Sequence, residues 1–352
     1  MRRGSTLASQ FGLTERIFAS GEDKAFAAAI EAGLDTVELG LHAQMRYADQ
    51  LADVTARYLL KAGGKRVRPM LTLLTAQLGD GNTPQVITAA EAVEITHLAS
   101  LYHDDVMDDA LMRRGVPSAQ TVWGNSVAVL TGDLLFARAS KLVADLGERA
   151  IRLQADTFER LCLGQLHETI GPEPDEDPIE HYLGVLADKT GSLIAVAAQM
   201  GVVFSNASSA YETPVVMFGE KIGVAFQLID DVIDLTSAAE TTGKMPGTDL
   251  RAGIATLPLL KLRERAPRDA DAAALLHRLE TEVIGAPADV NVADVDVTGA
   301  VAALREHDVT TETLAEAHEW ARQAVAALAP LPEGPVKKAL SRFADTIVER
   351  SS

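Results

Sequence analysis

Two acidic motifs with the same spacing interrupt a sequence that is otherwise rich in alanine, leucine and valine. Each contains the pattern Asp-Asp-x-x-Asp within apolar sequence, HDDVMDD in the first case and LIDDVID in the second. In an α-helix, residues four apart lie on one face, about 6 Å from each other along the axis. The acidic residues concerned are Asp104, Asp105, Asp108, Asp230, Asp231 and Asp234. Each motif therefore predicts a helical face that carries neighbouring carboxylates.

Neighbouring carboxylates in a partly buried site need a cation. Like charges a few ångströms apart raise each other's pKa or destabilise the site. Carboxylate oxygens select hard divalent ions such as Mg²⁺ or Mn²⁺, and Mg²⁺ prefers to complete its shell with water and phosphate oxygens. The motifs therefore predict a magnesium site for a di- or triphosphate, in which we expect Asp104 and Asp230 to face each other across a cavity. The alternative, helix caps or a solvated helix face, suits a single motif better than two copies between apolar residues.

Basic residues beside glycines predict a negatively charged ligand. The segment GGKRVRP presents three cations directly after a Gly-Gly turn, and further cations stand in RRG, DKTG and TTGK. Arginine can bind phosphate oxygens with two parallel hydrogen bonds, and lysine adds a point charge. The residues are Lys65, Arg66, Arg68, Arg113, Arg114, Lys189 and Lys244. For GGKRVRP alone, a helix C-terminus with surface charges is the alternative.

The elements that must position these side chains are predicted to be helices. Apolar residues make up 47% of the 352 residues and aromatic ones 5%, and apolar positions recur at three- and four-residue spacing from Lys24 to about residue 265. That period favours an all-α protein. Glycine and proline interrupt it, for example in the acidic loop GPEPDEDP. Because no linker divides the chain, we predict a lead-in over residues 1–22 and one helical domain over residues 23–352.

Charge and cysteine content exclude several classes of function. A net charge of −18 repels a phosphate backbone, so nucleic-acid binding is not expected. One cysteine, Cys162, excludes an intrachain disulfide and a cysteine metal cluster, and its apolar neighbours predict a small buried side chain. The N-terminus lacks a signal-peptide core, and no apolar run reaches the roughly 18 residues of a membrane span. We therefore expect a cytoplasmic protein without a transmembrane segment.

Together these motifs resemble those of the all-trans isoprenyl diphosphate synthases, the polyprenyl synthetase family. The resemblance runs from about Leu51 to the C-terminal VER and includes GGKRVRP, HDDVMDDALMRRG, KTGSL, FQLIDDVID and GKMPGTDLRAGIATLP in the family's order. It implies an all-α, isoprenoid-synthase-type helical bundle around a central active-site cavity, and a homodimer. It also implies a reaction between isopentenyl diphosphate and an allylic diphosphate that needs no protein nucleophile.

The resemblance further implies a role for each matching residue. The aspartates would hold three Mg²⁺ ions, for which Mn²⁺ could substitute, with Asp104, Asp108 and Asp230 as ligands and Asp105, Asp231 and Asp234 in support. The residues matched to isopentenyl diphosphate binding are Gly64, Lys65, Arg68, His97 and Arg114. The residues matched to allylic diphosphate binding are Arg113, Lys189, Thr190, Gln227 and Lys244. Phe226 lies where an aromatic face would stabilise a carbocation.

The implied reaction begins with ionisation of the allylic diphosphate, assisted by Mg²⁺ as a Lewis acid. The double bond of isopentenyl diphosphate then attacks, and loss of a proton gives a longer trans-allylic product. One position departs from the family pattern, because DLRAGIATLP has Ile254 where DL-x-x-GK-x-TLP commonly has lysine. One diphosphate contact is therefore missing or is supplied by a neighbour such as Arg251.

Small residues before the first motif bear on product length. Ala99 and Ser100 precede Asp104 by about one turn, where bulky side chains close the cavity in family members with short products. Their small size predicts a medium or long product, roughly C30 to C50 by analogy with the family. Alternatively, they only permit tight helix packing.

Three rival functions remain open or are disfavoured. A short-chain geranylgeranyl or farnesyl diphosphate synthase would share every motif except the product-length determinant. A non-catalytic subunit of a heteromeric synthase is kept open by Ile254 and disfavoured by two intact aspartate motifs. A class I terpene cyclase is disfavoured because such enzymes typically lack the basic GGKRVRP pocket.

Overall fold

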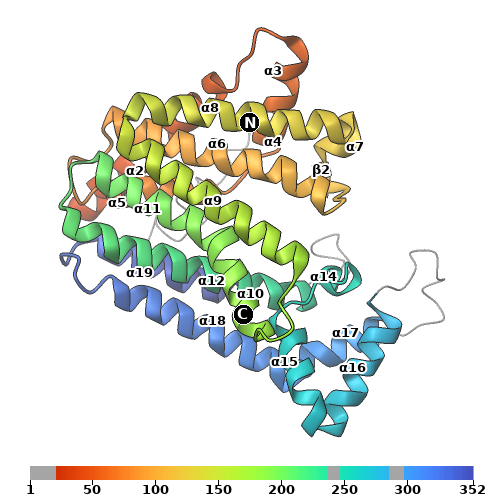
Figure 1. Cartoon of the computed structure of the whole chain (residues 1–352). Coiled ribbons are helices and arrows are strands. Elements are labelled where there is room, and N and C mark those ends of the chain that lie inside the picture. The colour runs from red at the N-terminus through yellow and green to blue at the C-terminus, as the bar shows by residue number, and fades with distance from the viewer. Residues whose placement is uncertain (1–20, 237–245, 285–296, 352) are drawn as a thin grey trace. The chain divides into compact units, whose positions relative to one another are not determined.

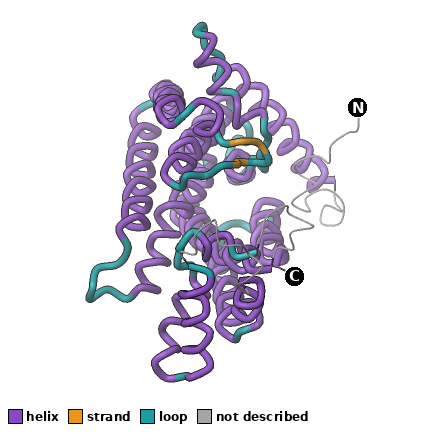
Figure 2. Tube along the Cα trace, turned by 90° about the vertical axis from the view of Figure 1, so that its right-hand side faces the viewer, coloured by secondary structure: helices purple, strands orange, loops and turns teal. Residues whose placement is uncertain are grey.

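The computed structural model of the chain describes residues 21–236, 246–284 and 297–351, and these residues fold almost entirely into helices (Figure 1). Within them, the strands are β1 (Met112–Arg113) and β2 (Val116–Pro117), which pair antiparallel with Met112 opposite Pro117. Figure 2 shows this short strand pair among the helices. The predicted all-α fold class is therefore confirmed.

The helices belong to two compact units of the chain, which we call unit 1 and unit 2. Unit 1 contains the residues up to Arg160, Ser192–Gly219 and Ala327–Phe343. Unit 2 contains Leu161–Gly191, Glu220–Ala326 and Ala344–Ser352. The single domain over residues 23–352 and the central cavity stay predictions.

Unit 1 is built around one central helix. Its elements are α2 (Gly21–Gln44), α3 (Gln50–Ala56), α4 (Tyr58–Lys61), α5 (Val67–Ala76), α6 (Pro84–Met107), the β1–β2 pair, α7 (Ala119–Trp123), α8 (Asn125–Leu146), the first part of α9 (Glu148–Ile170), α11 (Ser192–Phe204), the 3₁₀ turn η2 (Ser209–Tyr211), the first part of α12 (Glu212–Thr236) and the first part of α19 (Pro335–Val348). The central helix is α6, which packs against α2, α5, α8 and α11.

The sequence of α6 explains both its start and its burial. The hydroxyl of Thr83 accepts a hydrogen bond from the Val86 N–H at 3.2 Å, and Pro84 occupies the first turn, as is common at helix starts. Much of the helix is apolar on every side, which is typical of a helix enclosed by others. The core of unit 1 therefore fixes the direction in which α6 presents its C-terminal end.

Close contact between α5 and α11 holds the helix that follows the basic loop. The hydroxyls of Thr72 and Thr75 donate to the carbonyl oxygens of Ala197 and Ala198, each at 2.8 Å. A Cβ at Gly201 would lie only 2.1 Å from the Thr75 Oγ1, so the approach depends on glycine there. The start of α5 is thus tied to the core of unit 1.

Unit 2 contains the rest of the helices. These are the end of α9, α10 (Pro178–Leu186), the π-turn η1 (Ala187–Gly191), the end of α12, α14 (Thr248–Arg251), α15 (Leu257–Arg265), the 3₁₀ turn η3 (Ala266–Arg268), α16 (Ala270–Glu282), α17 (Val297–Glu306), α18 (Asp308–Ala327), the end of α19 and the 3₁₀ turn η4 (Glu349–Ser351). One apolar cluster joins α10, α12, α15 and α18, and another joins the end of α12 to α14, α15, α16 and α17. Both clusters include buried residues of α12, so its acidic end is held firmly within this unit.

Several predictions about segments can be compared with the structure. The acidic segment GPEPDEDP joins α9 to α10 and is exposed, as predicted. The predicted lead-in over residues 1–22 lies outside the described residues up to position 20, and α2 already begins at Gly21. The prediction of a buried Cys162 is wrong, because this residue lies on an exposed face of α9. Among the helices that the structure describes, none has the length and apolar character needed to cross a membrane.

Candidate active site

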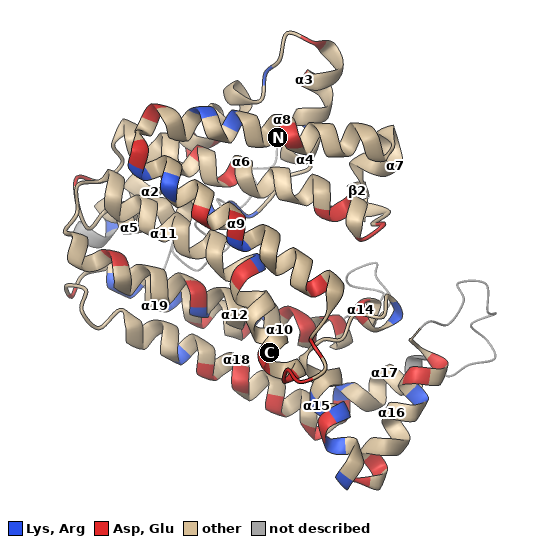
Figure 3. Cartoon of the chain, in the orientation of Figure 1, with Lys and Arg blue, Asp and Glu red and all other residues tan. Residues whose placement is uncertain are grey.

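The first aspartate motif lies at the C-terminal end of α6, where Figure 3 shows acidic residues gathered. Asp104 and Asp105 stand in the last turn, and the N–H of Asp108 donates to the Asp104 carbonyl at 2.8 Å. Asp104 is half-buried, Asp105 is buried and Asp108 is exposed. The C-terminal end of a helix carries partial negative charge, which destabilises acidic side chains unless a cation lies nearby. This end of α6 therefore suits bound cations.

Asp105 and Arg113 form an ion pair beside this motif. The Arg113 Nε donates to the Asp105 Oδ1 at 2.6 Å, and the Asp105 side chain is inaccessible to solvent. Burial raises the pKa of Asp105, against the opposing charge and hydrogen bond of Arg113. Its Oδ2 is buried and has no hydrogen-bond partner within the described part of the chain. A buried acceptor without a partner destabilises the folded state unless a water molecule or a cation contacts it. The carboxylate oxygens of the first motif therefore fit a divalent metal ion.

The β1–β2 hairpin directs the two arginines that follow the motif. Its two-residue turn consists of Arg114 and Gly115, which have positive φ of 52° and 77°. Such turns favour asparagine, aspartate or glycine, so an arginine there is strained. Arg113 reaches Asp105, whereas Arg114 donates to main-chain carbonyls that include that of Gly63. Because of this turn, the neighbouring side chains of Arg113 and Arg114 contact two different parts of the site.

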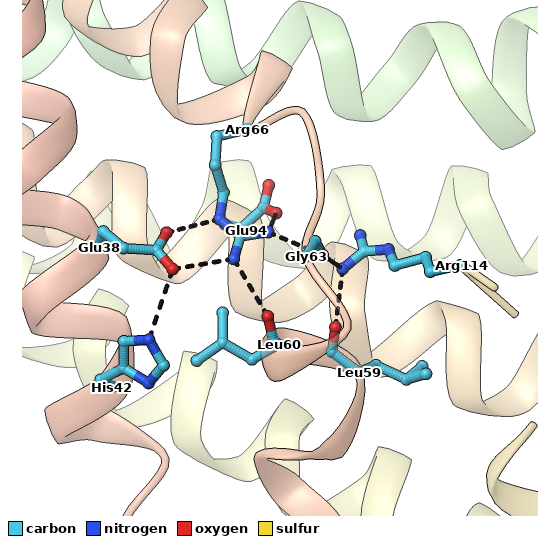
Figure 4. A network of polar contacts seen from close by, with 8 residues as sticks. All are labelled: Glu38, His42, Leu59, Leu60, Gly63, Arg66, Glu94 and Arg114. Carbon is cyan, nitrogen blue, oxygen red and sulfur yellow. Dashed lines mark hydrogen bonds and ion pairs between the residues drawn. The ribbon is translucent and has the colours of Figure 1, made fainter. Parts of the chain in front are cut away.

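The basic loop between α4 and α5 uses its three cations differently. The prediction that Arg66 binds phosphate together with Lys65 and Arg68 is not supported, because Arg66 is buried and paired with Glu38 and Glu94 (Figure 4). Burial alone would lower the pKa of Arg66, and the bonds and charges of the two glutamates outweigh burial and raise it. Lys65 is exposed in the loop, and Arg68 lies in the first turn of α5. Arg66 is therefore an internal anchor of the loop.

Arg68 and His97 are half-buried and, together with Arg114, form a basic cluster in unit 1. The Arg68 Nε is buried and has no hydrogen-bond partner among the residues that the structure describes. Burial lowers the pKa of Arg68 to about 10, with the charge of Arg114 also lowering it against Glu94 and Asp104. Burial and nearby arginines lower the pKa of His97 well below its usual value, so its imidazole is neutral at pH 7. This buried positive charge beside Asp104 favours an anionic ligand.

The second aspartate motif lies at the C-terminal end of α12, in unit 2. Asp230 is half-buried, and the Arg350 Nη2 lies 3.2 Å from its Oδ1. The guanidinium of Arg350 also lies 4.9 Å from the centre of the Phe226 ring. Phe226 and Gln227 are half-buried and stand about one turn before Asp230. The face of Phe226 can thus receive a cation, as its predicted role requires.

Asp231 lies in the interior of unit 2 and has two donors. The Tyr182 hydroxyl donates to its Oδ2 at 2.7 Å, and the Leu257 N–H donates to the same oxygen at 3.4 Å. Burial raises the pKa of Asp231 to about 8, although both hydrogen bonds lower it. Asp231 therefore links α12 to the middle of α10 and to the start of α15.

Asp234 holds the start of α14. Its carboxylate accepts the N–H groups of Thr248 and Asp249, each at 3.2 Å, and its carbonyl accepts the Gly247 N–H at 2.9 Å. A carboxylate is favourable at a helix N-terminus because the helix dipole is positive there. Asp234 thus fixes the start of α14, and its predicted role in support of the metal ligands stays a prediction. Lys244, which the sequence matched to the allylic diphosphate, lies outside the described residues.

Lys189 and Thr190 lie in the π-turn η1, between α10 and α11. Such turns insert one extra residue into a helix and are frequent at functional sites. The Lys189 Nζ lies 2.5 Å from the Glu168 Oε2 on α9. Both side chains are partly exposed, so this pair is open to exchange with a charged ligand.

Ile254, which stands where the family commonly has lysine, borders a cavity of about 620 Å³ in unit 2. Its side chain is 42% exposed, and Tyr182 lines the same cavity. Arg251, the neighbour expected to substitute for the lysine, donates from its Nε to the Pro246 carbonyl at 3.4 Å. The charge that the lysine would supply is therefore absent at position 254.

Ala99 and Ser100 are both buried on α6, about one turn before Asp104. The Ser100 hydroxyl donates to the His97 carbonyl at 2.9 Å, within the helix. Both side chains are small, which is the property from which a medium or long product is predicted.

Among the described residues, several side chains without a predicted role contact the predicted site residues. They include Glu38, Glu94, Glu168, Tyr182 and Arg350. Glu94 carried a signal, because an acidic residue in the apolar run EAVEITHLAS must find a buried partner. The others stand on amphipathic segments, where a polar side chain is expected on the surface.

Each aspartate motif supplies oxygen donors within its own unit. Among the described residues, no three His, Cys, Asp or Glu side chains lie close enough together to hold a metal ion. The first motif belongs to unit 1 and the second to unit 2, and their facing each other stays a prediction. The all-oxygen donors, the unpartnered Asp105 Oδ2 and the helix C-termini fit a hard divalent ion.

Known proteins resemble this chain over most of its length. A family model described as polyprenyl synthetase matches residues 49–293. The chain is 44% identical over 330 residues to a nonaprenyl diphosphate synthase of Mycobacterium tuberculosis, covering 93% of this chain and 95% of that protein. It is 31% identical over 319 residues to heptaprenyl diphosphate synthase component 2 of Bacillus subtilis, covering 90% and 88% of the two chains.

Solved structures show the same similarity. A polyprenyl synthase from Caulobacter crescentus, complexed with calcium and isoprenyl diphosphate, superimposes with a TM-score of 0.82 at 31% identity, covering 96% of this chain and all 100% of that chain. A geranylgeranyl pyrophosphate synthase from Corynebacterium glutamicum, complexed with the same ligands, gives 0.79 at 39% identity, covering 96% and 99%. These similarities extend across the acidic motifs and the basic loop.

Proposed function

This chain belongs to the polyprenyl synthetase family, and on that premise we propose that it condenses isopentenyl diphosphate with an allylic diphosphate to make an all-trans polyprenyl diphosphate of medium or long chain. Relatives named for nonaprenyl and octaprenyl products support a product in this range. Prenyl transfer is the activity of the family, and the site in unit 1 supplies groups suited to it.

The observation that carries the proposal is Arg68, a half-buried side chain whose Nε is buried. Its Nε has no partner among the described residues, and it lies in one electrostatic cluster with Arg114 and Asp104. A cation so placed is costly unless a ligand neutralises it. The diphosphate of isopentenyl diphosphate would satisfy Arg68 and would lie next to the first aspartate motif, where the allylic substrate is needed.

Five residues of unit 1 would bind isopentenyl diphosphate. Arg68 and Arg114 supply two positive charges, and the exposed Lys65 adds a third. The imidazole of His97 contributes a hydrogen bond. Gly64 allows the backbone to approach the ligand closely.

The allylic diphosphate would be held by Arg113, Lys189, Thr190, Gln227 and Lys244. Asp104, Asp108 and Asp230 would hold divalent ions, which we propose to be three Mg²⁺ per site, with Mn²⁺ as a possible substitute. When bound, Mg²⁺ supplies Lewis-acid stabilisation of the negative charge on the leaving diphosphate. Arg113 and Lys189 add positive charge to the same oxygens, and the face of Phe226 stabilises the allylic cation. The allylic C–O bond breaks, the double bond of isopentenyl diphosphate forms the new C–C bond, and the departing diphosphate takes the proton lost from the condensed intermediate.

Release of inorganic pyrophosphate tests this proposal. The purified protein, supplied with farnesyl diphosphate, isopentenyl diphosphate and Mg²⁺, should release pyrophosphate only when both substrates are present. Asp104→Asn should slow the release by roughly a hundredfold or more, because it removes charge at the point where the leaving group ionises. Release that continues without isopentenyl diphosphate would indicate a cyclase or a hydrolase instead.

Two alternatives are supported by particular observations. Similarity to a geranylgeranyl pyrophosphate synthase at 39% identity favours a shorter product as the second candidate. Similarity to a protein named as one component of a synthase, together with Ile254, keeps a subunit of a heteromeric enzyme as the third. A homodimer and a cytoplasmic location remain part of the proposal. Turnover by the purified chain without another subunit would exclude the subunit alternative.

A further inference from the structure

Arg66 is held by two carboxylates from two helices of unit 1 (Figure 4). Its Nε donates to the Glu38 Oε2 at 2.7 Å and its Nη2 to the Glu38 Oε1 at 3.1 Å, which makes a two-point bond to α2. Its Nη1 donates to the Glu94 Oε1 on α6 at 3.3 Å. The side chains of Arg66 and Glu94 are nearly inaccessible, whereas that of Glu38 is 36% exposed. Arg66 therefore ties the basic loop to both helices.

The carbonyl of Gly63 connects this network with Arg114 of the basic cluster. It accepts a hydrogen bond from the Arg66 Nη1 at 3.3 Å and another from the Arg114 Nη1. The C=O of one residue and the N–H of the next belong to a single planar trans peptide, in which they point in opposite directions. Two guanidinium groups on the Gly63 carbonyl therefore fix the Gly64 N–H so that it points away from both.

The loop conformation depends on these contacts. Gly64 has a φ of 151° and Arg66 a φ of 48°, and the left-handed region is unfavourable for arginine. A Cβ at Gly64 would lie 2.4 Å from the Arg66 Nη1 and 3.0 Å from the Arg114 Nη1. The guanidinium groups thus occupy the space that a side chain would take, and the glycine and the arginines form one matched arrangement.

We propose that Glu38 of α2 is a positioning residue for the isopentenyl diphosphate site, acting through Arg66 on the peptide between Gly63 and Gly64. The inference rests on the proposed function, which assigns this loop to isopentenyl diphosphate. Glu94 neutralises the buried arginine, and the two-point bond to Glu38 sets the rotation of its planar fork. Without Glu38 the fork loses its two-point bond and keeps only single bonds to Glu94, Gly63 and Leu60. Its rotation, and with it the direction of the Gly64 N–H, is then less tightly set.

Glu38 is also the member of the network whose replacement we expect to leave the fold intact. Its side chain is partly exposed, and its removal leaves the buried Arg66–Glu94 pair intact. Removing Glu94 instead would leave a buried guanidinium with less compensation, which is strongly destabilising. Glu38→Gln, which keeps the size and removes the charge, is therefore the informative variant.

The test compares Glu38→Gln with Asp35→Asn, which removes a charge from an exposed site one turn earlier on α2. Steady-state kinetics give kcat and a separate KM for each substrate, and titration calorimetry gives the affinity for isopentenyl diphosphate alone. We expect the KM and the dissociation constant for isopentenyl diphosphate to rise roughly tenfold in Glu38→Gln, as for the loss of a charge-assisted hydrogen bond. The KM for the allylic diphosphate, kcat and all values for Asp35→Asn should change less than about twofold.

Arg66→Lys is the second variant, because it keeps the charge and loses the planar fork. It should give the same selective rise in the KM for isopentenyl diphosphate. If Arg66→Lys does not fold, Glu38→Gln decides the matter alone. Unchanged affinity for isopentenyl diphosphate in Glu38→Gln overturns the inference, and so does an equal rise in both KM values with a lower melting temperature.

Failure of the proposed function gives a different pattern. If the wild-type protein binds isopentenyl diphosphate and converts it in the absence of an allylic diphosphate, the proposed function is wrong. The affinity of Glu38→Gln for isopentenyl diphosphate, measured by calorimetry, then still tests the positioning role. A wild-type protein that does not bind isopentenyl diphosphate refutes both. Normal turnover together with equal affinities in wild type and Glu38→Gln refutes the inference alone.

Discussion

Tyr182 donates a hydrogen bond to the buried carboxyl of Asp231, with 2.7 Å between the two oxygens. Burial raises the pKa of Tyr182 well above its usual value, so it stays a donor at every pH of interest. Asp231 belongs to the second aspartate motif, and Tyr182 also lines the cavity beside Ile254. The hydrogen bond therefore connects the acidic end of α12 with α10, the helix that precedes the Lys189 turn.

The raised pKa of Asp231 predicts a pH dependence of stability. The group binds its proton in the folded state up to about pH 8 but in the unfolded state only up to about pH 4. Its contribution is therefore present below about pH 4 and is lost as the pH rises through about 8, at no more than roughly 1.4 kcal/mol per pH unit. Denaturant unfolding of the metal-free protein at several pH values should show this loss.

Asp231→Asn should remove that part of the pH dependence, because an amide does not titrate. Asp175→Asn, in the exposed loop between α9 and α10, is the matched control and should keep the wild-type slope. Equal slopes for Asp231→Asn and the wild type would show that Asp231 is not protonated in the folded protein near neutral pH.

Arg68→Gln should weaken binding of isopentenyl diphosphate selectively. The variant removes the charge whose Nε has no partner among the described residues, so the KM for isopentenyl diphosphate should rise roughly a hundredfold. The KM for the allylic diphosphate should change only a few-fold. Lys61→Gln, an exposed site on α4, serves as the control for loss of charge. An equal effect on both substrates would place Arg68 outside a dedicated isopentenyl diphosphate site.

Ile254→Lys should strengthen binding of the allylic diphosphate. Position 254 is partly exposed, so a new cation is expected to lower the KM for the allylic substrate by only about three- to tenfold. Ile254→Met, which changes the shape without adding charge, should leave it unchanged. A KM that stays the same or rises in the lysine variant would mean that this turn does not approach the allylic diphosphate.

Ala99→Phe should shorten the product. Ala99 is fully buried about one turn before Asp104, and a phenyl ring there would obstruct chain growth beneath the first motif. Overpacking costs about 1–3 kcal/mol, so Ala90→Leu on the same helix is the control for general strain. If Ala99→Phe does not fold, Ser100→Phe tests the neighbouring residue of α6, which is also small and buried. Products of unchanged length in a folded variant would contradict an open path beside α6.

Local sequence patterns predicted the helices and the positions of the acidic motifs. The apolar period of α6 and the repeated aspartate spacing are properties of neighbouring residues, so HDDVMDD and LIDDVID could be placed on helices in advance. The basic loop was also placed, because Gly63 and Gly64 interrupt the helical pattern there.

The roles of single side chains depended on partners distant in sequence. From the sequence, Arg66 has the same predicted role as its neighbours Lys65 and Arg68. In the structure it pairs with Glu38 and Glu94, which the packing of α2 and α6 places beside it. In the same way, the apolar neighbours of Cys162 predicted burial, but α9 turns that residue to solvent. Such outcomes follow from the rotation of a helix about its axis, which a short sequence window does not determine.

The most direct test of the account is the size of the product. The purified chain should be incubated with farnesyl diphosphate, an excess of isopentenyl diphosphate and Mg²⁺, and the products should be dephosphorylated and sized. The account predicts a polyprenyl product of roughly C30 to C50, by analogy with the family, and none when a chelator removes the metal. Products that end at C20 or shorter would contradict the proposed chain length, and condensation that continues in the chelator would contradict the central role of the aspartate motifs.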